Sequence, residues 1–190
     1  MDVAGPNGAG KSTLVRKYGV AARIPVVNPD DIKVARDISA QDAGRLALME
    51  RVSLLQSCVS FAVETTLTGQ SELLLLKKAK ATGYKLNLVY VGIDDADQSN
   101  SRVLTRVARG GHDVPELDIY RRYNRSLQNL PKAMALCDRV RILDNAGADY
   151  RYVLSLDNHK VRFVSKQPPQ WLKVAVSPAL LKRNEQDLSR

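Results

Sequence analysis

An eight-residue segment near the start of the chain has the residue types and spacing of a phosphate-binding loop. It reads Gly5-Pro-Asn-Gly-Ala-Gly-Lys-Ser12 and fits the pattern G-x-x-x-x-G-K-[ST]. Glycine reaches backbone conformations closed to other residues, so successive N–H groups can turn inward around a polyphosphate. The Lys11 ammonium then reaches the β- and γ-phosphates, and the Ser12 hydroxyl can ligate Mg²⁺. The segment predicts ATP and Mg²⁺ as ligands, bound by Gly5, Pro6, Asn7, Gly8, Ala9, Gly10, Lys11, Ser12 and Thr13.

Carboxylates follow two of the predicted strands. Asp30 and Asp31 come after an apolar run at 25–28, and Glu64 ends a run at 60–64. In an open α/β sheet, ligands bind outside the carboxyl ends of the strands, so we expect all three near the loop. A carboxylate there could take the proton of an attacking hydroxyl. Asp30 and Asp31 could instead cap a helix, and Glu64 could hold Mg²⁺ or water, bind substrate or make a structural hydrogen bond.

Three arginines are spaced to share one helix face. Arg102, Arg106 and Arg109 lie at i, i+4 and i+7 of a helix predicted over 98–109, just before two glycines. An arginine face of this kind is ordinarily solvated. The alternative is a lid, which would exclude water and stabilise the charge of a transferred phosphoryl group. His112, in the following loop, could bind phosphate or simply lie exposed.

These residues need a scaffold, and strands alternate with helices along the chain. Strands are predicted at 1–4, 25–28, 60–64, 86–93 and 140–143, helices at 11–18, 40–58, 70–82, 98–109 and from 115, and a hairpin at 150–156 and 161–165. The alternation predicts an α/β fold in which a parallel sheet is flanked by helices. We expect Pro131 to bend or split the helix after 115, and Leu117 to lie on its buried stripe. The whole chain, 1–190, is predicted to be one domain with a lid at about 98–125 and a weakly patterned tail at 168–190.

The net charge of +9 indicates an anionic partner. Aromatic residues make up only 5% of the chain, so a stacking surface for single-stranded nucleic acid is poorly supported. We favour phosphate binding in a pocket and keep nucleic acid as the lesser alternative. No apolar run is long enough to cross a bilayer, and no secretory leader opens the sequence. Cys58 and Cys137 read as reduced core thiols, which together with these absences predicts a cytoplasmic protein.

An ordered set of motifs resembles the zeta toxin family, in its short bacterial branch of P-loop proteins. The set comprises the loop 5–13, Asn28-Pro-Asp-Asp31, Phe61-Ala-Val-Glu-Thr-Thr66, the segment 106–115 and Tyr123-Asn-Arg-Ser-Leu-Gln-Asn-Leu-Pro131. The resemblance implies a P-loop kinase fold. It also implies ATP-dependent phosphorylation of a sugar hydroxyl of UDP-N-acetylglucosamine, and a protein antitoxin as partner.

Residue by residue, the resemblance assigns roles to positions of this chain. Lys11 and Ser12 match the residues for ATP and Mg²⁺, and Asp30 matches the catalytic base. Arg106 and Arg109 match the lid arginines, with a shift toward Arg102 left open. The substrate side is matched by Asp31, Glu64, Thr65, Thr66, His112 and, as the helical glutamate that binds the sugar nucleotide, Glu50.

The chain also departs from the family pattern. Thr68 stands near the place where larger members carry an arginine, and Asn28 takes the first of two acidic positions. The apolar run before Gly5 is short, which would fit a start codon placed too late or a natural truncation.

Three other functions are alternatives to this kinase. An ABC-transporter ATPase is disfavoured because its L-S-G-G-Q-like signature is missing. A polynucleotide kinase or another nucleic-acid-related P-loop protein would bind with steep salt dependence. A non-catalytic ATP-dependent switch is the third alternative.

Overall fold

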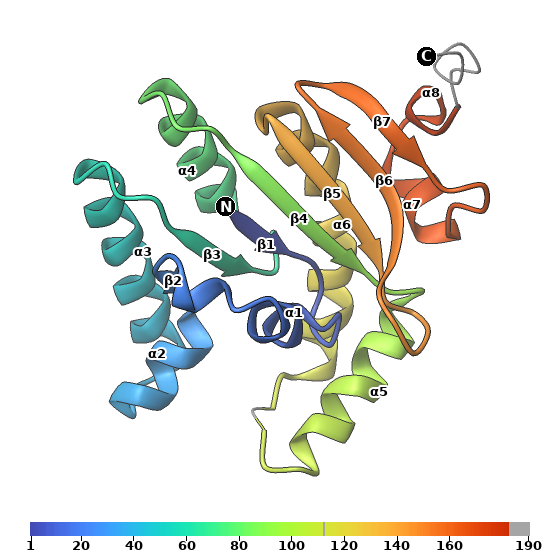
Figure 1. The fold of residues 1–190 in the computed structure, drawn as a ribbon. Coiled ribbons are helices and arrows are strands. Elements are labelled where there is room, and N and C mark those ends of the chain that lie inside the picture. Colours follow the sequence, from blue (N-terminus) through green and yellow to red (C-terminus); the bar gives the residue numbers. More distant parts are fainter. Residues whose placement is uncertain (112, 183–190) are drawn as a thin grey trace.

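A computed structural model describes residues 1–111 and 113–182 of the chain. Its centre is a seven-stranded sheet with the order β2-β3-β1-β4-β5-β6-β7 and helices on both sides (Figure 1). The strands are β1 Asp2–Ala4, β2 Val26–Val27, β3 Ala62–Thr65, β4 Asn87–Gly92, β5 Arg139–Asp144, β6 Arg151–Asp157 and β7 Lys160–Val164. The α-helices are α1 Lys11–Lys17, α2 Pro29–Arg36, α3 Ala40–Gln56, α4 Gln70–Ala81, α5 Ala96–Val107, α6 Glu116–Leu136, α7 Gln170–Ala175 and α8 Pro178–Leu181, and a 3-10 turn spans Val20–Ala22. The predicted α/β fold with a C-terminal hairpin is confirmed.

Strand direction decides where a ligand can bind. Strands β2, β3, β1, β4 and β5 are parallel, whereas β6 and β7 add to β5 as an antiparallel hairpin. Parallel neighbours need crossover connections, which the helices between them supply. The carboxyl ends of the five parallel strands therefore lie along one edge of the sheet. The glycine-rich loop leaves β1 at that edge.

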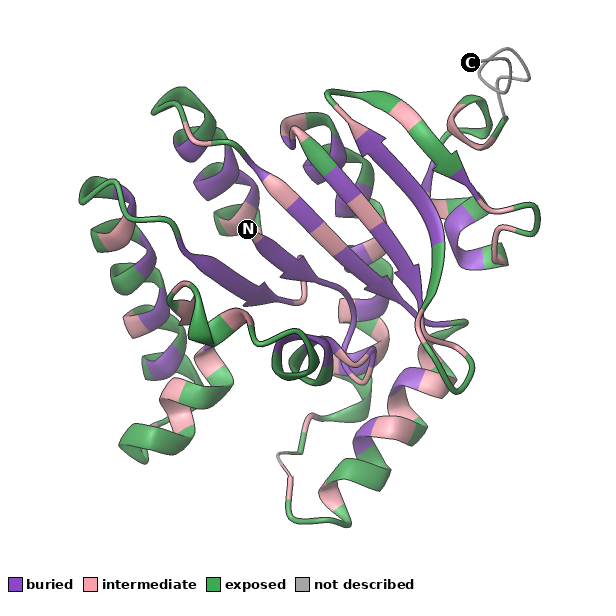
Figure 2. Ribbon diagram, viewed as in Figure 1, coloured by how far each residue is buried: buried purple, intermediate pink, exposed green. Residues whose placement is uncertain are grey.

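The sheet separates two apolar clusters because alternate side chains of a strand point to opposite faces. One face packs against α3, α4, α6 and α7 through residues such as Leu75, Leu130 and Trp171. The other packs Val3 and Val91 against Leu14 and Val15 of α1. Figure 2 shows β1 and β3 buried along their whole length. The loop is thus anchored to the most enclosed strands of the sheet.

Four expectations about local structure need correction. Pro131 does not split the last long helix, since α6 runs through it as one element. Leu117 is 85% exposed, and Ile119 takes the buried position instead. Cys58 is exposed, whereas Cys137 is buried as expected. The weakly patterned tail at 168–190 contains α7. Its Trp171 is buried: the ring packs in the apolar cluster, and the indole nitrogen donates to Asp144 Oδ1 at 3.0 Å.

No helix of the described ranges is both long and apolar enough to cross a membrane.

Candidate active site

The loop 5–10 turns tightly between β1 and α1. Gly5, Gly8 and Gly10 have φ values of +142°, +70° and +96°, which side-chain-bearing residues rarely adopt. A Cβ atom on Gly5 would lie 2.0 Å from the Val91 carbonyl oxygen, and one on Gly8 would lie 2.8 Å from that of Ser99. The Ala9 N–H donates to the Pro6 carbonyl at 3.3 Å. Glycine is required here both by backbone conformation and by close packing.

Lys11 and Ser12, at the start of α1, are engaged with neighbouring groups. Lys11 Nζ donates to the Pro6 carbonyl oxygen at 2.9 Å. Burial lowers the pKa of Lys11 to about 8, although the charges of Glu64 and Asp30 oppose this shift. Ser12 Oγ donates to Glu64 Oε1 at 2.5 Å, while Thr13 next to it is exposed. The ammonium and the hydroxyl therefore face the same end of the sheet as Glu64.

Glu64 is the buried carboxylate of the group. Its second oxygen, Oε2, accepts a hydrogen bond from Asn28 Nδ2 at 3.2 Å. The pKa of Glu64 is raised, chiefly because the carboxyl group is buried. The hydrogen bond from Ser12 and the charge of Lys11 oppose this rise, whereas the charges of Asp31 and Asp30 add to it. Both aspartates are therefore near enough for their charges to act on Glu64, as their predicted placement at the strand ends implies.

Asn28, rather than either aspartate, caps the following helix. Its Oδ1 accepts the Asp30 N–H at 3.0 Å, and Pro29 occupies the first helical position. Asp30 and Asp31 lie exposed in the first turn of α2. Neither carboxylate accepts a hydrogen bond within the described part of the chain. Their side chains are thus available to a ligand.

The arginines of α5 divide into separate environments. Arg106 lies close enough to Lys11 for its charge to lower the Lys11 pKa, and so does Arg122 of α6. Arg102 Nη2 donates instead to the carbonyl oxygens of Ala146 and Gly147, at 3.3 and 3.5 Å. Arg109 is exposed in the turn after α5. His112 lies outside the described residues.

Arg122 was not selected from the sequence. It follows Arg121 directly on α6, which packs beside α5 (Figure 1), and its charge acts on Lys11. The sequence does offer one signal, since Arg121, Arg122 and Arg125 follow Arg102, Arg106 and Arg109 within 24 residues. The contact itself depends on how the two helices pair.

Two threonines after Glu64 have different surroundings. Thr65 is buried, donates to Glu72 Oε1 of α4 at 3.2 Å and accepts the Leu67 N–H at 3.0 Å. Thr66 Oγ1 lies 3.1 Å from Thr68 Oγ1. Thr65 therefore organises the turn that leads into α4, and Thr66 pairs with the threonine that stands where larger zeta toxins carry an arginine.

Glu50 lies on α3, apart from the group around Lys11. It lines a groove between α2 and α3 with Ile32, Arg36, Leu46, Met49 and Ser53. The groove is flanked by α2, the helix that carries Asp30 in its first turn.

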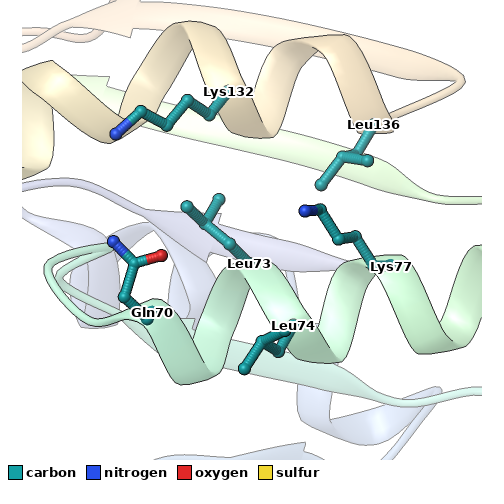
Figure 3. A pocket seen from close by; sticks show the side chains of 6 residues that line it. All are labelled: Gln70, Leu73, Leu74, Lys77, Lys132 and Leu136. Atoms are coloured by element: carbon teal, nitrogen blue, oxygen red, sulfur yellow. The ribbon is translucent and has the colours of Figure 1, made fainter.

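A second groove lies between α4 and α6, away from these residues. Figure 3 shows Lys77 of α4 and Lys132 of α6 beside it, together with Gln70, Leu73, Leu74 and Leu136. None of the site residues predicted from the sequence lines it.

The oxygen atoms beside the loop suit a hard cation. Among the described residues, no three His, Cys, Asp or Glu side chains form a metal-binding group. Mg²⁺ does not need one, because it is usually bound by one or two protein oxygens, substrate phosphates and water. The Ser12 hydroxyl and the Glu64 carboxylate meet at 2.5 Å and fit that description.

Comparison with other proteins gives one curated relative. An uncharacterized protein of Haemophilus influenzae is 35% identical over 126 residues, which cover 63% of this chain and 88% of the relative. The chain belongs to the same family as this protein. No protein-family model matches the chain.

Two groups of solved structures share the fold of this chain. The crystal structure of AvrRxo1-ORF1:-ORF2 with ATP matches with a TM-score of 0.69 at 19% identity, over 84% of this chain and 58% of that chain. The PezAT toxin–antitoxin system of Streptococcus pneumoniae matches with a TM-score of 0.60 at 16% identity, over 82% of this chain and 71% of that chain. The resemblance to zeta toxins is thus confirmed for the fold. The chain spans less than two thirds of the AvrRxo1 chain that it matches.

Proposed function

We propose that this protein is an ATP-dependent kinase of zeta toxin type, which transfers the γ-phosphate of ATP to a hydroxyl of a small acceptor. The observation that carries the proposal is the juxtaposition of Lys11, Ser12, Glu64 and Asp30 at one end of the sheet. A phosphate loop alone would suit any nucleotide-binding protein. An exposed carboxylate beside the γ-phosphate position is what a transfer reaction needs in addition.

Loop residues 5–10, with Lys11 and Ser12, bind the triphosphate in this proposal. The N–H groups of the loop donate to phosphate oxygens, and the Lys11 ammonium leaves the Pro6 carbonyl to bind the β- and γ-phosphates. For Lys11 this exchange replaces a neutral acceptor by an anionic one, which makes a stronger hydrogen bond. ATP as the bound nucleotide is supported by the likeness in fold to AvrRxo1-ORF1:-ORF2, whose structure contains ATP.

Asp30 acts as the general base. It accepts the proton of the acceptor hydroxyl as that oxygen bonds to the γ-phosphorus and the bond from this phosphorus to the β–γ bridging oxygen breaks. Negative charge on the transferred group is met by Lys11, Arg106 and Arg122, which share this end of the sheet. Arg109 joins them only when the segment after α5 folds inward. Ser12 and Glu64 hold Mg²⁺, which draws charge from the phosphate oxygens when bound.

The acceptor side is assigned to α2, α3 and the end of β3. Asp31, Thr65, Thr66 and His112 are proposed to border the acceptor, and the groove at Glu50 to take its distal part. A nucleotide sugar such as UDP-N-acetylglucosamine is the acceptor class we propose. Arg36 in the same groove offers a cation to its phosphates, which supports this class.

A protein antitoxin is the proposed partner. The support is that PezAT, which shares the fold, is a toxin–antitoxin system.

The test is incubation of the protein with γ-labelled ATP and Mg²⁺ against nucleotide sugars, nucleosides and oligonucleotides. We expect label on a nucleotide sugar and none on the oligonucleotides. Label on oligonucleotides alone would establish the nucleic-acid-related kinase instead. Saturable ATP binding with no label on any acceptor would favour the ATP-dependent switch.

A further inference from the structure

We infer that Ser99, Asn145 and Tyr150 are positioning residues that hold the phosphate loop in its binding shape before a nucleotide arrives. The inference rests on the proposed function for the identity of the ligand. It goes beyond that function because none of the three belongs to the loop motif.

Each of these side chains donates a hydrogen bond to a loop carbonyl. Ser99 Oγ donates to the Asn7 carbonyl oxygen at 2.5 Å, and Asn145 Nδ2 donates to that of Ala9 at 2.8 Å. Tyr150 OH donates to the Gly10 carbonyl oxygen at 2.7 Å. Ser99 has no exposed surface. Three of the loop's carbonyls are therefore bound by side chains from outside the loop, and that of Gly10 also accepts the Leu14 N–H of α1 at 3.0 Å.

A bound carbonyl fixes the direction of the next N–H group. In a planar trans peptide the C=O of one residue points opposite to the N–H of the following residue. Binding the carbonyls of Asn7, Ala9 and Gly10 outward thus turns the N–H groups of Gly8, Gly10 and Lys11 to the other side. None of these three N–H groups donates to another residue in the described ranges. They remain as donors for an anion.

The three donors belong to two segments that are themselves joined. Ser99 lies in the first turn of α5, and the other two lie in the β5–β6 loop, residues 145–150. Gln98 Nε2 of α5 donates to the Ala146 carbonyl of the β5–β6 loop at 3.0 Å. The Lys17 ammonium, 5.9 Å from the Tyr150 ring centroid, adds a contact that fixes the ring. The start of the arginine-bearing helix and the phosphate loop are thereby held as one unit.

The close approach explains why Gly10 has no side chain. A Cβ atom there would lie 2.6 Å from Asn145 Nδ2 and 2.8 Å from Tyr150 OH. A methyl group on Gly10 would therefore displace the side chains that bind the loop.

Tyr150→Phe tests the inference because it removes the donor and keeps the ring. We expect the Kd for ATP–Mg²⁺ to rise about five- to tenfold, the ratio that loss of one ordinary hydrogen bond gives. Titration calorimetry measures it without any acceptor. The matched control is Tyr152→Phe, since Tyr152 lies on β6 and is 53% exposed.

A second pair of variants separates positioning from folding. Ser99→Ala removes the donor on α5, and Ser101→Ala removes an exposed hydroxyl two residues away. If these residues position the loop, Ser99→Ala and Tyr150→Phe should each raise the Kd for ATP and for inorganic triphosphate. In both variants the KM for ATP should rise by a larger factor than kcat falls. A purely structural role would lower the thermal midpoint and leave the Kd of the folded protein unchanged.

The outcomes are distinct. Wild-type affinity in both variants, with ATP binding by the wild type intact, would overturn the inference and leave the proposed function standing. Weaker binding of ATP with unchanged binding of triphosphate would also overturn it, because Tyr150 would then act on the base. Absence of ATP binding in the wild type would overturn the proposed function together with the inference.

Discussion

The two sides of the site differ in how completely they are built. On the side of the phosphate loop, Lys11 and Glu64 are buried, and the loop carbonyls are bound by side chains from distant parts of the sequence. On the side of α2 and α3, Asp30, Asp31 and Glu50 are exposed, and the two helices pack against each other. The geometry of the phosphate-loop side is fixed by the fold, whereas the side of α2 and α3 is exposed to solvent.

The difference matches what each side would have to bind. A triphosphate presents the same oxygens in every kinase, so a preformed set of donors costs nothing at the moment of reaction. In the proposed reaction, the hydroxyl of the acceptor must reach Asp30 in place of a water molecule. Enzymes commonly achieve this by closing the site around the bound acceptor. We therefore expect substitutions on the loop side to act on ATP binding, and substitutions on the open side to act on turnover and on the acceptor.

Replacement of Asp30 should have the largest effect. Asp30→Asn keeps the shape and removes the proposed base, so kcat should fall about a thousandfold, within the range ascribed to general bases. The Kd for ATP should stay within about twofold, since Asp30 lies on the open side. Asp37→Asn, at the other end of α2, is the control. A Kd for ATP that rises in step with the loss of kcat would erase the distinction between the two sides.

A methyl group in the loop should come next. Gly10→Ala combines a φ of +96° with contacts of 2.6 and 2.8 Å. Strain of this kind costs about 1–3 kcal/mol, and misplaced N–H groups add to it, so ATP affinity should fall about a hundredfold. Gly44→Ala, on α3 in open space, should instead stabilise the protein by about 0.5–1 kcal/mol. Calorimetry and thermal unfolding measure the two effects, and intact affinity in Gly10→Ala would refute the packing argument.

The pH dependence of ATP binding should reveal the buried lysine. Burial lowers the Lys11 pKa from 10.5 to about 8, so the ligand-free protein loses this charge as the pH rises through 8. ATP binds the charged form, and the Kd should rise about tenfold per pH unit above that point, with a proton taken up on binding. Lys11→Met should remove this dependence. A flat Kd between pH 8 and 9.5 in the wild type would show that Lys11 keeps its charge in the ligand-free loop.

The smallest expected effect lies at the groove between α2 and α3. Glu50→Gln should raise KM for the acceptor about fivefold, because the amide keeps an acceptor oxygen and loses only the charge, and it should leave the Kd for ATP unchanged. Steady-state kinetics with the acceptor identified by labelling checks this. Unchanged KM would remove Glu50 from the acceptor site and leave α2 and the end of β3 to form it.

The sequence predicts the loop side and the fold because their signals are local. The residues 5–13 are contiguous, and the strand-end placement of Asp30 and Glu64 follows from the alternation of strands and helices. Ser99, Asn145 and Tyr150 could not be found in that way. Their contacts span 92, 136 and 140 residues, so they exist only once the sheet is assembled.

The errors in the helices have a similar origin. Leu117 was expected inside because it is apolar, but the phase of α6 is set further along by Tyr123, Leu130 and Met134, which pack on the sheet. Trp171 lies in a segment too short to show periodicity, and tertiary contacts bury it. Local pattern predicts an element well only when the element is long enough to repeat.

The most direct test of the account is equilibrium binding of ATP–Mg²⁺ to the wild type and to Lys11→Met, with no acceptor present. Because the loop side is complete by itself, we predict saturable one-to-one binding by the wild type. In Lys11→Met the Kd should be at least about thirtyfold higher, as expected for loss of a charge-assisted contact to phosphate. Equal affinity in the two proteins, or no saturable binding in either, would contradict the assignment of residues 5–13 as the ATP site.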